Sequence, residues 1–349
     1  MKGKGFNKLR LAGSSAIGAS MLLAGGAASR VLADEQKSGQ GTRGGGSVVV
    51  RTGISWFVST STNTNGISGM GFNDASFTTS ATTTGGATTE LNDAFDGCEI
   101  MAVDGTGYAD PDGVLDLNGD VMTGDPTTIA GLTVSRQFRW NNATLANGTA
   151  VVRSLNTFVN PGGAGISVMV SFGCNLGSDS GSIVEGTSNG SGNVPVTDDN
   201  LWFVTSDAQP YGDPPITHVR YGQGAAVTAV FDAGNGPPGP GVNDFVDTYA
   251  LTVPPGQTRH ILRYIGLSNG GGASLADAPT FENLASLNTA GLLAGIPPTE
   301  LSGNVANFEP LTAPAPAAIP SMSRIGTWLL AGTLGLLAVF GLRRRTSAS

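Results

Sequence analysis

The chain is poor in the residue types on which most catalytic sites depend. Its 349 residues include 2 histidines and 2 cysteines, and Lys37 is the one lysine between the terminal segments 1–33 and 324–349. A hydrolytic triad needs a histidine beside a serine and a carboxylate. His218 and His260 both lie in strand-like segments, and no His-Glu-x-x-His zinc motif occurs. We therefore expect no catalysis.

Basic residues are also scarce once the two ends are set aside. Residues 34–323 contain 9 of the 18 Lys and Arg and all 26 Asp and Glu, a net charge of −17. Because nucleic-acid phosphates need a basic partner, this balance argues against nucleic acid as a partner. It favours solubility and weak binding of divalent cations.

Long helical patterns are scarce, and short strand patterns take their place. The chain has 53 glycines, and short β-branched or aromatic runs alternate with turn residues, which favours an all-β fold built as an antiparallel β-sandwich. We expect a β-sandwich region over 47–308, long enough for one large domain or two ordinary ones, with ten strands at 47–51, 54–59, 98–103, 133–140, 149–159, 166–172, 201–205, 226–231, 245–253 and 258–267.

Two local patterns suggest how the end of this domain folds. Tyr249, Leu251 and Val253 alternate before Pro254-Pro255-Gly256, so 245–253 and 258–267 should form a hairpin. Apolar residues spaced three or four apart over 281–287 and 301–308, each following proline, predict two short helices that cap an open end of the sandwich.

The two cysteines suggest a covalent link within the domain. Cys98 and Cys174 would meet oxidising conditions if the chain is exported, and a disulfide between them is the favoured interpretation. The alternative is two separate buried thiols.

An acidic loop is the strongest candidate for a ligand site. It spans residues 104–120 and contains Asp110, Asp112, Asp116 and Asp120 among glycines. Calcium prefers carboxylate oxygens on a flexible loop, but the spacing of these aspartates differs from the spacing of the ligands in an EF-hand. Asp112-Gly113 and Asn118-Gly119 also fit hairpin turns, which we favour over a calcium site.

Other candidate ligand groups have simple structural interpretations. Trp56, Trp140 and Trp202 lie inside predicted strands and are expected in the core, whereas Tyr211 lies on a loop and is the better candidate for stacking on a sugar. The paired carboxylates Asp198 and Asp199 would suit a glycosidase, but a Gly/Ser-rich loop more often leaves such pairs solvated.

The C-terminus has three successive parts. A Pro/Ala linker over 309–318 leads to Ile319, Pro320, Ser321, Met322 and Ser323. An uncharged run from Ile325 to Leu342 follows; at 1.5 Å per residue it is about 27 Å long and predicts a transmembrane helix. The run is followed by Arg343, Arg344 and Arg345, which we expect to stay on the cytoplasmic side of the membrane.

This order resembles the IPTL-CTERM sorting signal, a PEP-CTERM-like signal of Gram-negative surface proteins. The match lies in Ile319, Pro320, Ser323 and Gly326, with Ser321, Met322 and Ile325 in place of Thr, Leu and Trp. The resemblance covers residues 319–345 and implies cutting by a membrane-embedded exosortase. An ordinary uncut membrane anchor is the alternative.

The N-terminus is consistent with export. Lys2, Lys4, Lys8 and Arg10 precede a small-residue apolar stretch, and Val31-Leu32-Ala33 fits a cleavage site, with Ala28 as its rival. Residues 1–33 are thus predicted to be a signal peptide and 34–46 a flexible leader. The sequence predicts an inner-membrane intermediate, then a structural or adhesive protein of the envelope, cell surface or extracellular matrix.

The alternatives are a carbohydrate-binding module, helped by calcium and binding extracellular polysaccharide, and in third place an envelope glycosidase or peptidase.

Overall fold

The fold is described from a computed structural model. It covers residues 47–62, 68–77, 81–82, 88–89, 91, 93–113, 116–177, 182–207, 212–233 and 243–311. The predicted signal peptide, leader and sorting signal lie outside these residues. Among the residues covered, no helix is long and apolar enough to cross a membrane.

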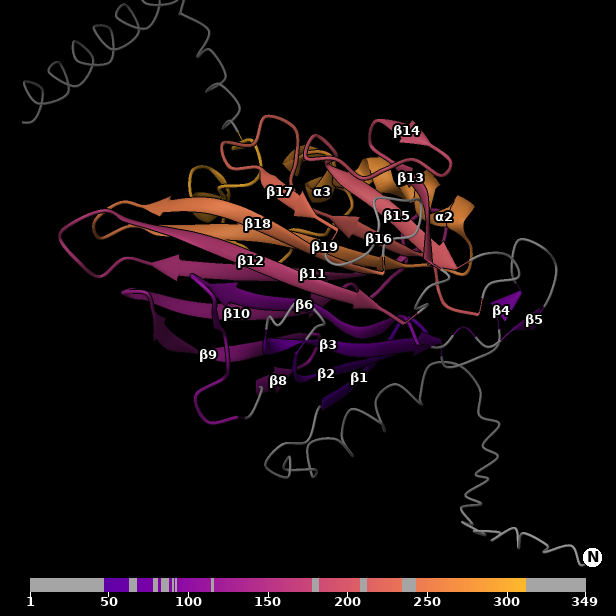
Figure 1. Cartoon of the computed structure of the whole chain (residues 1–349), viewed down its shortest axis with the longest axis horizontal. Coiled ribbons are helices and arrows are strands. Elements are labelled where there is room, and N and C mark those ends of the chain that lie inside the picture. The colour runs from indigo at the N-terminus through magenta and orange to yellow at the C-terminus, as the bar shows by residue number, and fades with distance from the viewer. Residues whose placement is uncertain are drawn as a thin grey trace, which may run out of the picture. The chain divides into compact units, whose positions relative to one another are not determined.

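Most of the described strands belong to two antiparallel sheets (Figure 1). The first sheet contains, in spatial order, β1 (Ser47–Arg51), β2 (Ile54–Thr62), β3 (Ser68–Phe77), β6 (Phe95–Val103), β12 (Ile166–Leu176), β18 (Asp244–Val253) and β17 (Ala229–Asp232), with β7 (Thr106–Gly107) paired to β6.

The second sheet contains β14 (Gly190–Ser191), β13 (Ser182–Thr187), β15 (Trp202–Asp207), β16 (Ile216–Val219), β19 (Thr258–Leu267), β11 (Ala150–Val159), β10 (Leu132–Trp140), β9 (Val121–Ile129) and β8 (Asp116–Asn118). A separate small pair joins β4 (Ala81–Thr82) and β5 (Thr88–Thr89).

The core lies between the two sheets, as a sandwich requires. Alternate side chains of β10, including Val134 and Phe138, pack in one cluster with Phe72 of β3 and Phe172 of β12. The rings of Phe72 and Phe138 are 4.7 Å apart. The predicted antiparallel β-sandwich is confirmed, and each of the ten predicted strands overlaps an observed one.

One strand that the sequence pattern missed, β3, contains glycine where the backbone is crowded. A Cβ on Gly71 of β3 would lie 2.4 Å from the carbonyl oxygen of Cys98, and one on Gly69 would lie 2.9 Å from that of Met101. Glycine normally weakens a strand, but only glycine allows β3 to approach β6 this closely.

The predicted hairpin of β18 and β19 is wrong. β18 pairs with β12 in the first sheet, whereas β19 pairs with β11 in the second, so the chain crosses between sheets at 254–257. The connection from β11 to β12 also crosses between the two sheets, beside 254–257. There the Asn160 side chain donates to the carbonyls of Ala164 and Val253 at 2.7 and 2.9 Å. Alternation identifies a buried face but does not identify the partner strand.

Short helices cover the outer face of the second sheet. They are α2 (Gly271–Asp277), η3 (Ala278–Phe281), α3 (Leu284–Thr289) and α4 (Pro298–Leu301), and they lie beside β15, β16 and β19 (Figure 1). Phe281 and Leu287 pack with Trp202, Leu262 and Tyr264 in a second apolar cluster. The expected helix over 301–308 is not present, because α4 ends at Leu301. The helices also cover a sheet face rather than the open end that the sequence suggested.

The C-terminal boundary lies slightly beyond the predicted one. Phe308 is fully buried, the backbone N–H of Glu309 donates to the carbonyl of Gln223, and Leu311 packs against the second apolar cluster. The first residues of the predicted linker therefore belong to the packed domain.

Candidate functional site

The acidic loop brings together two of its four predicted carboxylates and adds a third that the sequence did not indicate. Oxygens of Asp110, Asp112 and Asp125 lie within 4.8 Å of one another. Asp116 instead lies exposed in β8, and Asp120 pairs with Arg139 at 3.1 Å. The predicted set of four therefore does not converge on one point.

The oxygens of Asp110 already accept hydrogen bonds. They accept from the backbone N–H groups of Asp112 and Asp125 at 3.3 and 2.7 Å, and the Asp110 carbonyl accepts from Gly113 at 3.1 Å. Burial raises the pKa of the Asp110 carboxyl. Gly113 and Gly119 have φ values of 74° and 64°, which the turns require. The favoured interpretation as turns accounts for this geometry without an ion.

We expect calcium to have little effect on the stability of the chain. Millimolar calcium should move the thermal midpoint by less than about 5 °C relative to sodium chloride of equal ionic strength. The Asp110 oxygens already accept backbone hydrogen bonds, and the exposed carboxylates of Asp112 and Asp125 give only salt-like screening. Thermal melts of the full chain measure this. A larger shift that Asp112→Ala abolishes and Asp116→Ala leaves intact would establish a calcium site instead.

The predicted disulfide is confirmed. Cys98 and Cys174 are bridged, each is 1% exposed, and they lie on the neighbouring strands β6 and β12. The register of these strands shifts beside them, and Glu99 has a φ of 55°. Such a bulge places two successive residues, Cys98 and Glu99, both inside the protein.

A buried network of charges lies next to the disulfide. Arg263 donates to Glu99 at 2.7 Å and to Asp247 at 2.8 Å, and Arg220 donates to Asp247 at 2.7 Å. Arg136 lies 3.8 Å from Glu99 and donates to the carbonyls of Met70 and Glu99 and to Asn156 and Ser154. Each of these five charged residues is at most 2% exposed.

This network links the two sheets. Its carboxylates come from β6 and β18 of the first sheet, while Arg136 and Arg263 come from β10 and β19 of the second. Burial lowers the pKa of Arg136 to about 10. Burial alone would raise the pKa of Asp247, but Arg220 and Arg263 outweigh it and lower that pKa. The network was not predicted from the sequence, although Arg136 and Asp247 each occupy a buried position in an alternating strand.

Both histidines have structural partners. His218 lies near the disulfide, its ring stacks on Phe203, and Nε2 lies 2.9 Å from the Thr205 hydroxyl. Burial lowers its pKa to about 3, so the ring is neutral at ordinary pH. Nε2 of His260 lies 2.9 Å from Glu300, beside α4.

The pattern Gly-x-Ser-x-Gly, typical of hydrolase nucleophile elbows, occurs at 186–190 and 266–270. Ser268 follows β19 and precedes α2, the strand-turn-helix setting of such an elbow. However, Ser268 is fully buried, its hydroxyl lies 2.8 Å from the Gly270 carbonyl and from the Ser274 hydroxyl, and its φ is not positive. The Ser188 hydroxyl accepts from the backbone N–H of Leu201. Both serines thus have local structural roles.

The structure shows the positions of most of the remaining candidate ligand residues. Trp56, Trp140 and Trp202 are buried, as predicted, and Tyr211 lies outside the described residues. Asp198 and Asp199 are exposed, but the Asp198 carboxylate accepts from the backbone N–H of Phe231 at 2.7 Å. Among the residues that the structure describes, the exposed large apolar side chains are Met169 and Val230, neither of them aromatic.

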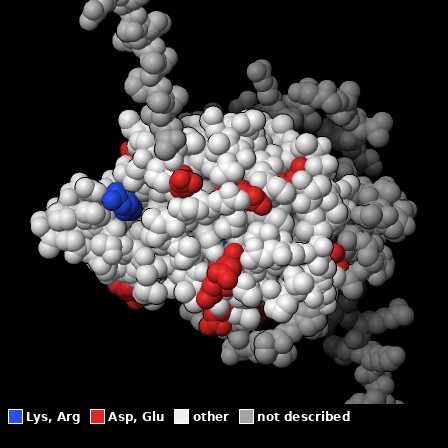
Figure 2. Space-filling view, turned by 90° about the horizontal axis from the view of Figure 1, so that it is seen from above, with Lys and Arg blue, Asp and Glu red and all other residues white. Residues whose placement is uncertain are grey.

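Cations and anions are distributed unevenly between interior and surface. Four of the seven arginines in the described segments, namely Arg136, Arg153, Arg220 and Arg263, are at most 2% exposed. Most of the acidic residues remain at least partly exposed. The face shown in Figure 2 accordingly carries red acidic groups in several places and little blue. The surface is therefore more anionic than the composition alone indicates.

Comparison with known proteins does not place the chain in a family. No protein-family model matches it, and no curated protein is similar to it. A human-microbiome protein provisionally assigned as a kojibiose phosphorylase is 9% identical with a TM-score of 0.38, over 71% of this chain and 33% of that chain. This chain therefore spans only about a third of that protein.

A second solved structure, a protein from Klebsiella pneumoniae provisionally assigned as an aldose 1-epimerase, is 10% identical with a TM-score of 0.28, over 79% of this chain and 97% of that one. Neither similarity is high enough to support an inference about function.

Proposed function

We propose that the chain is an exported envelope protein of a Gram-negative cell, with a structural or adhesive role at the surface or in the extracellular matrix. It is delivered through the inner membrane, where an exosortase-like protease cuts it near Ile319 and Pro320. The function resides in the folded sandwich as a displayed surface, not in a reaction.

The disulfide is the observation that supports this proposal most strongly. Cys98 and Cys174 form a buried link within the first sheet. Because disulfides form and persist in oxidising compartments, the bridge favours a protein that leaves the cytoplasm. The signal-like segments at the two ends of the sequence favour the same destination.

The positions of the candidate catalytic groups support a non-enzymatic role. His218 is buried and neutral, and Ser268 hydrogen-bonds within its own turn. His260 joins β19 to Glu300 of α4. Both histidines and Ser268 thus have structural partners, which supports a role other than hydrolysis.

The anionic surface limits the kinds of partner that the protein can bind. It disfavours nucleic acid and favours a solvated, non-aggregating particle. Extracellular polysaccharide is the proposed partner at the surface. A calcium-assisted carbohydrate-binding module ranks second, because the tryptophans are in the core and the oxygens of Asp110 accept backbone hydrogen bonds.

Substituting Pro320 should leave the protein in the inner membrane. In the producing cell, Pro320→Ala removes the proline of the motif that the protease is proposed to recognise, so the uncut chain should accumulate with its apolar run 325–342 in the bilayer. Fractionation of inner and outer envelope, followed by immunoblotting, measures this.

Pro314→Ala, in the preceding linker, is the matched control and should reach the surface normally. Equal surface delivery of both variants would contradict recognition of this motif.

A further inference from the structure

Two arginines face each other on the outer side of the second sheet. Arg139 of β10 and Arg153 of β11 are directly opposed in the strand register. Like charges in this position repel each other and destabilise a strand pair. A carboxylate of Asp120 lies 3.1 Å from Arg139, but none lies within 4.0 Å of Arg153 among the described residues.

Arg153 is buried, and its hydrogen bonds are incomplete. It is 2% exposed and donates through Nη1 to the carbonyls of Leu292 and Ala294 at 3.2 and 2.8 Å, and through Nη2 to Gln137 at 2.9 Å. Its Nε–H has no partner in the described part of the chain. Burial lowers the pKa of Arg153. The neutral acceptors at its two Nη groups do not balance its charge, and an uncompensated buried charge is costly.

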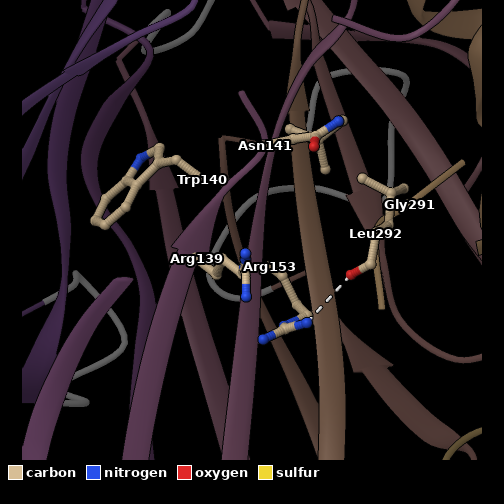
Figure 3. Close-up of a pocket in the computed structure, with 7 residues that line it drawn as sticks. Arg139, Trp140, Asn141, Arg153, Gly291 and Leu292 are labelled. Carbon is tan, nitrogen blue, oxygen red and sulfur yellow. Dashed lines mark hydrogen bonds between the residues drawn. The ribbon is translucent and has the colours of Figure 1, made fainter. Parts of the chain in front are cut away.

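A small pocket lies between these guanidinium groups and the loop that precedes α4. It is lined by Arg139, Trp140, Asn141, Val151, Arg153, Gly291 and Leu292, and its volume is about 10 Å³. That volume is roughly enough for one water-sized particle. In Figure 3 the Arg139 and Arg153 side chains lie close together, with Trp140 directed away from them.

We propose that this pocket binds one small anion of halide size, held by the guanidinium groups of Arg139 and Arg153 that line it. Such an ion supplies negative charge next to two opposed cations that have one carboxylate partner between them. A carboxylate oxygen has the same chemistry and could enter only if its remaining atoms stay outside the pocket. The inference does not depend on the proposed surface role.

Chloride NMR of the full chain tests the proposal. Exchange with a bound site broadens the chloride line, and we expect broadening that saturates with chloride concentration. Arg153→Gln and Arg139→Gln should each weaken the apparent affinity roughly tenfold or more, because each removes a charged donor. Arg51→Gln, on β1 of the other sheet, is the matched control and should leave the affinity unchanged.

Each outcome decides for or against the pocket. A broadening that is absent, or that Arg51→Gln reduces as much as the pocket variants do, overturns the proposal. Competition by acetate supports the same site and extends it to carboxylates, and failure of acetate to compete supports a site limited to halides.

Because substitution of the buried Arg153 puts folding at risk, the unaltered chain offers a second test. Crystals soaked in bromide should show an anomalous peak between the Arg139 and Arg153 guanidinium groups. A pocket that holds only water under these conditions overturns the proposal whatever the variants do.

Discussion

The double variant Cys98→Ala/Cys174→Ala should melt roughly 10 °C below the unaltered chain. The bridge joins residues 76 positions apart, and in the chain-entropy account closing such a loop stabilises a protein by about 4 kcal/mol. For a domain of this size, 1 kcal/mol moves the midpoint by roughly 2 to 4 °C. Differential scanning calorimetry under non-reducing conditions measures the difference.

Reductant provides the control for this experiment. It should lower the midpoint of the unaltered chain once the buried bridge is reduced, and it should leave the double variant unchanged. Two titratable thiols per native chain, or identical midpoints for the two proteins, would contradict the account.

Asp247→Asn should be similarly damaging, at about 3 to 5 kcal/mol, because breaking a buried ion pair leaves its partners uncompensated. The carboxylate oxygens of Asp247 accept from Arg220 and Arg263 at 2.7 and 2.8 Å. An asparagine retains one such acceptor and turns an NH₂ group toward the other guanidinium. Chemical denaturation of both proteins gives the difference in unfolding free energy.

Asp116→Asn is the control, because it makes the same chemical change on an exposed strand and should cost less than about 0.5 kcal/mol.

The contribution of Asp247 to the free energy of unfolding should also depend on pH. Since its pKa is lowered in the folded chain, its contribution is complete above the unfolded value of about 3.9 and is lost as the pH falls through the lower folded value. A loss below about 1 kcal/mol at neutral pH would show that the network is not a substantial link between the sheets.

The sequence was informative about where strands occur and less so about what they pair with. Period-two alternation located β10, β11, β18 and β19 within a few residues. It could not show that 254–257 crosses between sheets, because a buried face looks alike in a hairpin and in a crossover. It also passed over β3, whose glycines reduce strand propensity while permitting close contact with β6.

The chemistry of the interior was harder to predict. The disulfide could be predicted because two cysteines in a chain with a signal-like N-terminus have few alternatives. The ion network depends on side chains far apart in sequence, such as Glu99 and Arg263, 164 positions apart. A charged residue on an apolar face is visible in the sequence, but its partner is set by the sheet order. For the same reason Asp125 joined Asp110, and Asp116 and Asp120 did not.

We propose that this chain is exported and cut at both ends before it reaches the surface. The most direct measurement is the mass of the surface form, purified from the producing cell, together with its terminal peptides. We expect an N-terminus at Asp34 and a C-terminus near the Ile319 to Ser323 motif, without Arg343 to Ser349. A surface form that retains the intact C-terminus in most molecules would contradict it.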